Sequence, residues 1–141
     1  MDSNFYVEFE DNFRGSLEQI YEIFSNYDGL IQHILDIDNE PSLLDIGCGR
    51  GEFLRKCSKL GFRTQGIEIN PQMALISRNY GLNIKEGNAM ILLKDLPDNH
   101  FSLITAFHLI EHISFESINL LLKECRRILK TDGILVLETP S

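Results

Sequence analysis

The sequence predicts an α/β domain with a doubly wound, mostly parallel sheet. From residue 41 onward, short apolar runs alternate with amphipathic stretches of helical spacing, and glycine or proline separates them. A glycine-rich turn follows the first apolar run. Alternating strands and helices are typical of a parallel sheet with crossover helices. At 141 residues, the chain is long enough for one domain with a substantial core.

Residues 1–40 precede this alternation, and we predict an N-terminal helical segment that covers the ligand site. Ser16 and Gln19 have capping-box spacing, and apolar residues then recur at helical intervals as far as Leu35. A break is expected at residues 26–29. The remaining residues, 41–141, form the predicted core.

Five strands are predicted in this core, and turn residues bound the helices between them. The strands span residues 43–46, 64–69, 82–85, 101–106 and 133–138. The helices span residues 52–60, 71–80, 89–94 and 115–129. Pro71 suits a first helical turn, and Gly61 and Gly81 are typical of helix ends.

Composition excludes several classes of function. A net charge of −8 and a pI near 4.9 oppose the basic surface that nucleic acids require, so a small molecule or sugar is the better partner. Three cysteines without C-x-x-C spacing indicate reduced core thiols. No apolar run reaches the roughly 18 residues of a membrane span, and no stretch resembles a signal peptide. We therefore expect a cytoplasmic protein without membrane insertion.

The glycine turn indicates the class of ligand. Residues 43–52 read Leu-Leu-Asp-Ile-Gly-Cys-Gly-Arg-Gly-Glu, and glycine lets a ligand approach the backbone closely. A dinucleotide fingerprint would need glycine where Glu52 stands, and its carboxylate would repel a pyrophosphate. An NAD-type oxidoreductase is therefore disfavoured. A ligand with a ribose and an ammonium but no phosphate fits better.

The motif Asp45-x-Gly47-x-Gly49-x-Gly51, followed by Glu68 at the end of the second strand, resembles class I S-adenosylmethionine (SAM)-dependent methyltransferases over roughly residues 41–139. The resemblance implies that SAM is the cofactor. It implies cofactor contacts at Asp45, Gly47, Cys48, Gly49, Glu68, Ile69, Asn88, Ala89 and Phe107. A carboxylate can accept both hydroxyl protons of a ribose, which suits Glu68, although an acid that caps the helix at Pro71 is the alternative.

Two of these contacts concern the adenine. Ile69 would lie against the ring. The family often has Gly-Asp-Ala after the third strand, and this chain has Gly87-Asn88-Ala89. An Asn carbonyl oxygen can still accept from the adenine amino group.

The segment Phe13-Arg14-Gly15, the run from Phe107 to Ile113 and the ending 137–141 look like methyltransferase domains encoded with surface-polysaccharide and O-antigen biosynthesis enzymes. This second resemblance implies that Arg14 pairs with the cofactor carboxylate in bidentate fashion. A surface arginine is the alternative.

His108, Glu111 and His112 are the candidate catalytic residues. An alcohol acceptor must lose a proton, which either histidine can take while Glu111 orients the ring. The H-x-x-E-H spacing also occurs in zinc peptidases, but the strand-like residues 101–106 oppose the long helix that such a site needs. Ubiquinone-type O-methyltransferases have Glu-x-x-Glu-His where this chain has His108-x-x-Glu111-His112. This resemblance implies a divalent metal at these three residues as an alternative to our metal-free prediction. Structural roles for the histidines are a further alternative.

These inferences predict O-methylation of a sugar or another small hydroxyl compound. The alternative is a non-catalytic SAM-binding module with a regulatory or assembly role. Because a complete fold of the family has seven strands, we expect strands six and seven to be missing and the fifth strand to be an exposed edge. Such a truncated core should bind SAM weakly to moderately and methylate poorly. The sequence does not specify the acceptor, the base or the oligomeric state.

Overall fold

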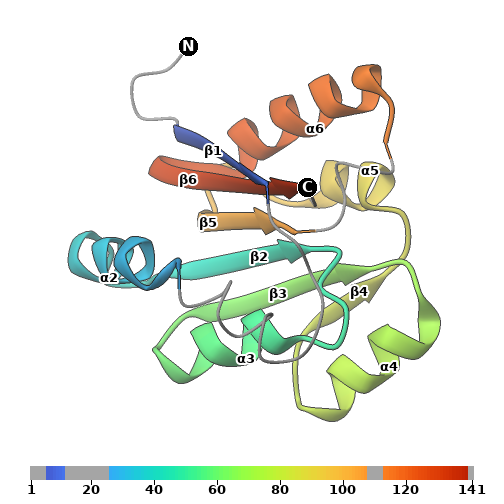
Figure 1. Cartoon of the computed structure of the whole chain (residues 1–141), viewed down its shortest axis with the longest axis horizontal. Helices are drawn as coiled ribbons and strands as arrows, with labels where there is room; N and C mark the ends of the chain where they lie inside the picture. The colour runs from blue at the N-terminus through green and yellow to red at the C-terminus, as the bar shows by residue number, and fades with distance from the viewer. Residues whose placement is uncertain (1–5, 12–25, 108–112, 140–141) are drawn as a thin grey trace.

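A computed structural model describes residues 6–11, 26–107 and 113–139 (Figure 1). The described strands form a parallel six-stranded sheet in the order β1-β6-β5-β2-β3-β4. They are β1 (Tyr6–Asp11), β2 (Ser42–Ile46), β3 (Arg63–Glu68), β4 (Ile84–Glu86), β5 (Phe101–Ala106) and β6 (Leu129–Thr139). The helices are α2 (Asp28–Ile37), α3 (Glu52–Lys59), α4 (Pro71–Asn79), α5 (Ala89–Leu92) and α6 (Phe115–Ile128), with a 3₁₀ turn, η1, at Leu93–Asp95.

Helices cover both faces of the sheet, so the central strands are buried on both sides. Leu43 packs into the cluster with α2, α3 and α4, whereas the next residue, Leu44, packs into the cluster with α5 and α6. Leu103 and Ile104 on β5 divide between the two clusters in the same way. This alternation explains why the strands read as continuous apolar runs.

The predicted fold class is confirmed. The five predicted strands correspond to β2 to β6, and they stand in the sheet in the order expected of a doubly wound fold. The predicted helix after Asn70 is also present, because Asn70 Oδ1 accepts from the amides of Gln72 and Met73 and so caps α4. Since β5 and β3 flank β2 on opposite sides, the direction of winding reverses between β2 and β5.

The expectation of an exposed edge at the fifth predicted strand is wrong. The backbone of β1 pairs in parallel with β6, from Tyr6 beside Ile134 to Asp11 beside Thr139 (Figure 1). The pairing supplies partners for amides and carbonyls that the edge would otherwise present to solvent. Strand β6 thus has a partner on each side, and an open edge at β6 is no reason to expect weak SAM binding.

The composition made two further predictions. Cys48, Cys57 and Cys125 are free and buried, as expected of core thiols, and burial raises the pKa of Cys57 and of Cys125 to about 12. Within the described ranges, no helix has the length and apolarity needed to cross a membrane.

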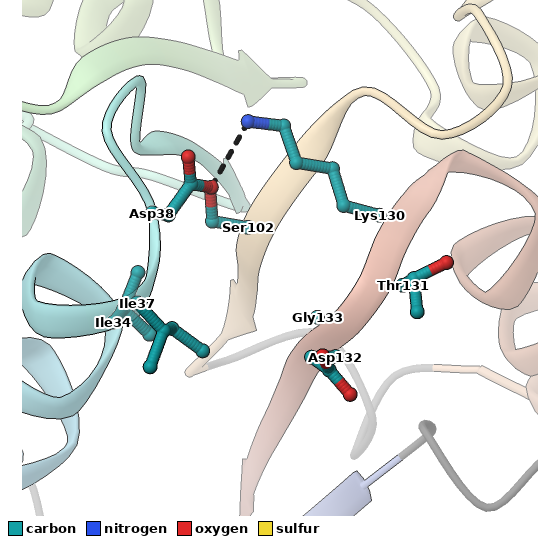
Figure 2. Close-up of a pocket in the computed structure, with 8 residues that line it drawn as sticks. All are labelled: Ile34, Ile37, Asp38, Ser102, Lys130, Thr131, Asp132 and Gly133. Atoms are coloured by element: carbon teal, nitrogen blue, oxygen red, sulfur yellow. Dashed lines mark hydrogen bonds and ion pairs between the residues drawn. The ribbon is translucent and has the colours of Figure 1, made fainter.

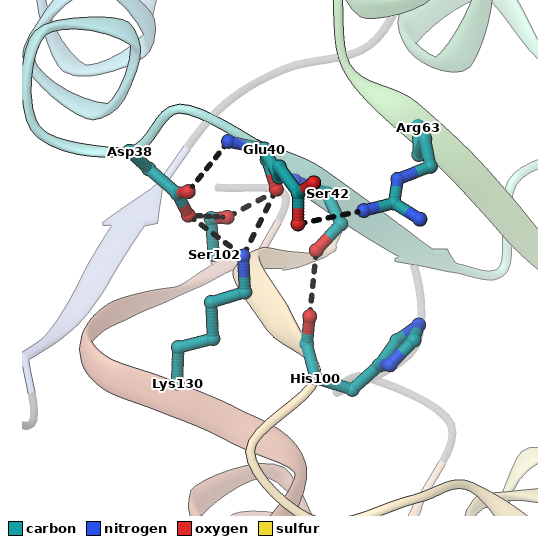
Figure 3. Close-up of polar contacts among 7 residues, drawn as sticks. All are labelled: Asp38, Glu40, Ser42, Arg63, His100, Ser102 and Lys130. Carbon is teal, nitrogen blue, oxygen red and sulfur yellow. Dashed lines mark hydrogen bonds and ion pairs between the residues drawn. The ribbon is translucent and has the colours of Figure 1, made fainter.

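At the amino ends of the strands, a polar cluster formed by Asp38, Glu40, Ser42, His100, Ser102 and Lys130 connects the end of α2 with the starts of β2, β5 and β6 (Figure 3). Lys130 Nζ donates to Asp38 Oδ2 and to the Glu40 carbonyl, each at 2.9 Å. Ser102 Oγ donates to the same Asp38 oxygen at 2.5 Å. Burial raises the pKa of Asp38, but the hydrogen bonds from Ser102 and Lys130 outweigh it and lower that pKa overall.

A small pocket of about 240 Å³ lies beside this cluster (Figure 2). Ile34 and Ile37 of α2 form one wall, and Thr131 to Gly133 of β6 form another. Asp132 has a positive φ of 67°, within an irregular stretch of β6 where the register with β5 shifts.

Candidate functional site

The glycine loop after β2 lies at the carboxyl edge of the sheet, where ligands bind in open α/β folds. Gly47 and Gly49 have positive φ values of 74° and 59°, and a Cβ built on either would meet nothing within 4 Å. Gly51 differs, because its Cβ would lie 2.5 Å from Leu82 Cδ1 and its φ is 83°. The first two glycines leave space at the site, and the third permits the chain to enter α3.

Glu68 ends β3 opposite this loop, and two backbone amides hold its carboxylate. Gly49 N donates to Oε1 at 2.7 Å, and Asn70 N donates to Oε2 at 2.9 Å. Only 9% of the residue's surface is exposed. Carboxylate oxygens have lone pairs for further donors, so the group is fixed and can still accept from a ligand.

A cavity of about 550 Å³ opens between the glycine loop, the ends of β3 and β4, and the start of α6. The described residues that line it are Gly47, Gly49, Ile67, Glu68, Ile69, Gly87, Asn88, Ala89, Met90, Ile113, Ser114 and Ser117. Its volume suits a ligand of nucleoside size or larger. Six of the predicted cofactor residues are in this lining: Gly47, Gly49, Glu68, Ile69, Asn88 and Ala89.

Asn88 has a structural role in addition to its place in the cavity. Its Oδ1 accepts from Met90 N at 2.8 Å and caps α5. A carbonyl oxygen has a second lone pair, so the cap leaves capacity for one more donor. The contact between Asn88 and the adenine amino group stays a prediction.

Three other predicted cofactor residues are described but do not line this cavity. Asp45 is buried, and its Oδ1 accepts from Thr105 Oγ1 at 2.9 Å. Cys48 is buried, and desolvation together with the nearby Asp45 and Glu68 carboxylates raises its pKa. Phe107 packs edge-on against Phe53, with ring centroids 5.0 Å apart. Their direct contact with the cofactor stays a prediction.

Four predicted residues lie outside the described residues, namely Arg14, His108, Glu111 and His112. The chain is described up to Phe107 and again from Ile113, and Ile113 lines the cavity. The three candidate catalytic residues thus belong to residues 108–112, between Phe107, which follows β5, and Ile113, which lines the cavity.

Sequence reasoning found Asn88 and Ala89 at the start of α5, but not Met90 or the wall contributed by the start of α6. Ile113, Ser114 and Ser117 come from a segment with no glycine motif. Ser114 Oγ accepts from Ser117 N and caps α6, so an N-cap signal did mark this helix start. Only the fold shows that this helix begins beside the glycine loop.

A family model described as a methyltransferase domain matches residues 19–141. The chain belongs to the class I SAM-dependent methyltransferase family. The resemblance on the glycine loop and Glu68 is thereby confirmed, and SAM is the cofactor of this methyltransferase domain.

Two proteins of similar sequence are also named as methyltransferases. A phosphoethanolamine N-methyltransferase of Plasmodium falciparum is 33% identical over 129 residues, which are 87% of this chain and 45% of that protein. A ubiquinone biosynthesis O-methyltransferase of Xanthomonas oryzae pv. oryzae is 26% identical over 102 residues, 69% of this chain and 42% of the relative. This methyltransferase domain thus spans less than half the length of either relative.

A solved structure is similar as well. The crystal structure of a SAM dependent methyltransferase from Archaeoglobus fulgidus superposes with a TM-score of 0.69 at 32% identity. The match covers 84% of this chain and 50% of that one.

The residues of the cavity fit SAM. The fixed Glu68 carboxylate can accept from the two ribose hydroxyls. Ile69, Ala89 and Met90 provide apolar surface for a flat base. The open space at Gly47 and Gly49 would let the methionine portion approach the backbone.

Proposed function

We propose that this domain supports O-methylation of a sugar or another small hydroxyl compound. The observation that carries the proposal is the Glu68 carboxylate, which two backbone amides hold beside the open space at Gly47 and Gly49. The same cavity is lined by Ile113, the residue that follows 108–112 in the sequence. When bound, SAM supplies an electrophilic methyl group on its sulfonium sulfur. The protein must then hold a hydroxyl near that methyl and remove its proton.

The proton acceptor in this proposal is His108 or His112, with Glu111 as the group that orients the ring. Support comes from the flanks of the segment, because Phe107 follows β5 at the carboxyl edge and Ile113 lines the cavity. A neutral imidazole can accept a proton near pH 7. Arg14 is proposed to pair with the cofactor carboxylate, within the N-terminal segment 1–40 that is proposed to cover the cofactor. Helix α2 of that segment contributes no residue to the described cavity lining.

Replacing His108 and His112 separately by Gln tests the base. The residue that takes the proton should lose about 100-fold or more in kcat, since general base catalysis contributes roughly 10²- to 10⁴-fold. His33, on α2 and away from the described cavity, provides the matched His→Gln control, and its replacement should leave kcat unchanged. Full turnover in both His108→Gln and His112→Gln would remove the histidines from catalysis.

Metal removal tests the alternative in which His108, Glu111 and His112 hold a divalent ion. We propose a metal-free reaction, so dialysis against EDTA should leave turnover unchanged. A loss that Mg²⁺ or Mn²⁺ restores would contradict this and favour the metal site.

An amine acceptor is the second candidate function. It is favoured by the 33% identity over 87% of this chain to a protein named phosphoethanolamine N-methyltransferase. Incubation with isotopically labelled SAM and separate panels of sugars, phenols and ethanolamine phosphates separates the two by the mass and fragmentation of the product. Label on nitrogen would favour the second candidate. SAM binding without transfer to any acceptor by the full-length protein would favour a non-catalytic module.

Glycan and cell-surface polysaccharide acceptors, and a cytoplasmic location, belong to this proposal. The acidic charge of −8 supports a neutral or cationic small acceptor over a polyanion. Comparing methylated sugars in cells with and without the intact gene tests the glycan acceptor directly.

A further inference from the structure

Ser77 is a fully buried serine on α4, directly beneath the glycine loop. Its Oγ donates to the Gly49 carbonyl at 2.6 Å. A serine inside a helix commonly bonds to a carbonyl of its own preceding turn. Here the hydroxyl instead reaches a loop 28 residues away in sequence.

Gly49 is consequently held on both of its backbone polar groups. Its amide donates to Glu68 Oε1 at 2.7 Å, and its carbonyl accepts from Ser77. Glycine has the largest backbone freedom of any residue, and a φ of 59° is one of several conformations open to it. The two hydrogen bonds select that conformation beside the cavity.

These contacts close a ring of interactions around the site. Glu68 also accepts from Asn70 N, and the Asn70 side chain caps α4 through Gln72 N and Met73 N. The helix that Asn70 caps is the one that carries Ser77. The ring therefore runs from Gly49 through Glu68 and Asn70 to α4, and back to Gly49 through Ser77.

We propose that Ser77 is a positioning residue for SAM. Its hydroxyl holds the Gly49 carbonyl and so fixes the backbone conformation of Gly49. The Gly49 amide then keeps the Glu68 carboxylate in the orientation that receives the ribose. The inference rests on SAM as the cofactor of this site and extends the proposed function to a residue outside the cavity wall. The loop is then preorganised, and less ordering is required when SAM binds.

Ser77→Ala tests the proposal, because it deletes one hydroxyl from a helical position where alanine is favourable. Titration calorimetry should show about tenfold weaker SAM binding, equivalent to ~1.4 kcal/mol and within the usual range for one hydrogen bond. Amide exchange at Gly49 in the SAM-free protein should accelerate. Neither measurement depends on the acceptor.

Ser42→Ala is the matched control. Ser42 is also a buried serine whose hydroxyl donates to a backbone carbonyl, that of His100 at 2.7 Å, but it lies at the opposite edge of the sheet (Figure 3). It should lower the thermal unfolding temperature much as Ser77→Ala does, while SAM affinity stays within twofold of the wild type.

The SAM affinities of the wild type and the two variants distinguish the role of Ser77 from the proposed function. Unchanged SAM affinity in Ser77→Ala, or an equal loss in Ser42→Ala, would overturn the role of Ser77 and leave the proposed function intact. Absence of SAM binding by the wild type would overturn the proposed function and this inference together. Loss of affinity confined to Ser77→Ala, with faster exchange at Gly49, supports it.

Discussion

At the carboxyl edge of the sheet, the Glu68 carboxylate is held by two backbone amides beside a cavity of about 550 Å³. At the amino edge, the Asp38 carboxylate is held by the Ser102 hydroxyl and the Lys130 ammonium beside a pocket of about 240 Å³. Both acids are well ordered by hydrogen bonds. They differ in the charge of their donors and in the space before them.

The difference shows how one sheet separates binding from stability. Two neutral amide donors fix Glu68, and the remaining lone pairs of its oxygens stay available to a ligand. A lysine neutralises Asp38, so that carboxylate contributes to joining α2 with the starts of β5 and β6. We therefore expect substitutions at the carboxyl edge to change SAM affinity, and substitutions at the amino edge to change the free energy of unfolding.

Glu68→Gln should have the largest effect. In the wild type, Gly49 N and Asn70 N donate to different carboxylate oxygens. In glutamine an NH2 group replaces one of these oxygens and cannot accept from the amide there, and the side chain has no charge for the ribose. SAM affinity should fall about 100-fold, since hydrogen bonds to a charged group contribute roughly 1.5–3 kcal/mol. Calorimetric titration measures it.

Glu86→Gln is the control for this change, because Glu86 stands in register with Glu68 on the neighbouring strand and faces Arg78 at 3.7 Å. Its replacement should leave SAM affinity within twofold. Equal losses in the two variants would mean that overall charge, and not the held carboxylate, governs binding.

Gly51→Ala should have the next largest effect, and on stability. Its Cβ would lie 2.5 Å from Leu82 Cδ1, in a backbone conformation that side chains disfavour. The free energy of unfolding should fall by about 1–2 kcal/mol, mainly through the positive φ and in part through the shift that the new Cβ forces on the Leu82 side chain. Gly61→Ala shares the positive φ, at 105°, but meets nothing within 4 Å. Gly61→Ala should therefore lower the free energy of unfolding, measured in urea, by less than Gly51→Ala does. Equal losses of stability in the two variants would exclude the contact with Leu82 as the cause.

Asp38→Asn should lower the free energy of unfolding by about 1–2 kcal/mol, because it removes the charge that Lys130 faces in a partly buried pair. SAM affinity should not change. An altered affinity with unchanged stability would contradict the separation of the two edges.

The same residue predicts a pH dependence. Because the folded-state pKa of Asp38 is lowered, its stabilising contribution is complete above the unfolded-state value near pH 4 and is lost as the pH falls through the folded-state value. Urea unfolding at several pH values should show a steeper loss below pH 4 in the wild type than in Asp38→Asn. Parallel curves would contradict the lowered pKa.

The buried thiol of Cys48 should be protected from modification in the folded protein. Burial raises the pKa of Cys48, so this thiol should react with iodoacetamide at pH 8 far more slowly in the folded protein than in urea. Mass spectrometry of the labelled protein measures the difference. Rapid labelling of folded protein at Cys48 would show that the glycine loop opens without ligand.

The sequence was sufficient where the information is local. The glycine loop and Glu68 could be found because a strand end, a turn and a helix start follow one another in the chain. Ser77 could not be found, since a serine in a helix has no sequence signal for a partner 28 residues away. The strand at residues 6–11 was missed although Val7 and Phe9 alternate with Glu8 and Glu10, which is a local strand signal. Its pairing with β6 has no such local signal.

The pairing of β1 with β6 has a consequence for biosynthesis. Strand β1 is the first described element to leave the ribosome, and its partner is the last, with Tyr6 beside Ile134. Contacts between distant parts of a chain form late, because closing so long a loop costs entropy before any bond forms. During translation, β1 therefore has no complete β6 to pair with until synthesis has passed residue 139, and its unpaired edge can associate with other chains during that period.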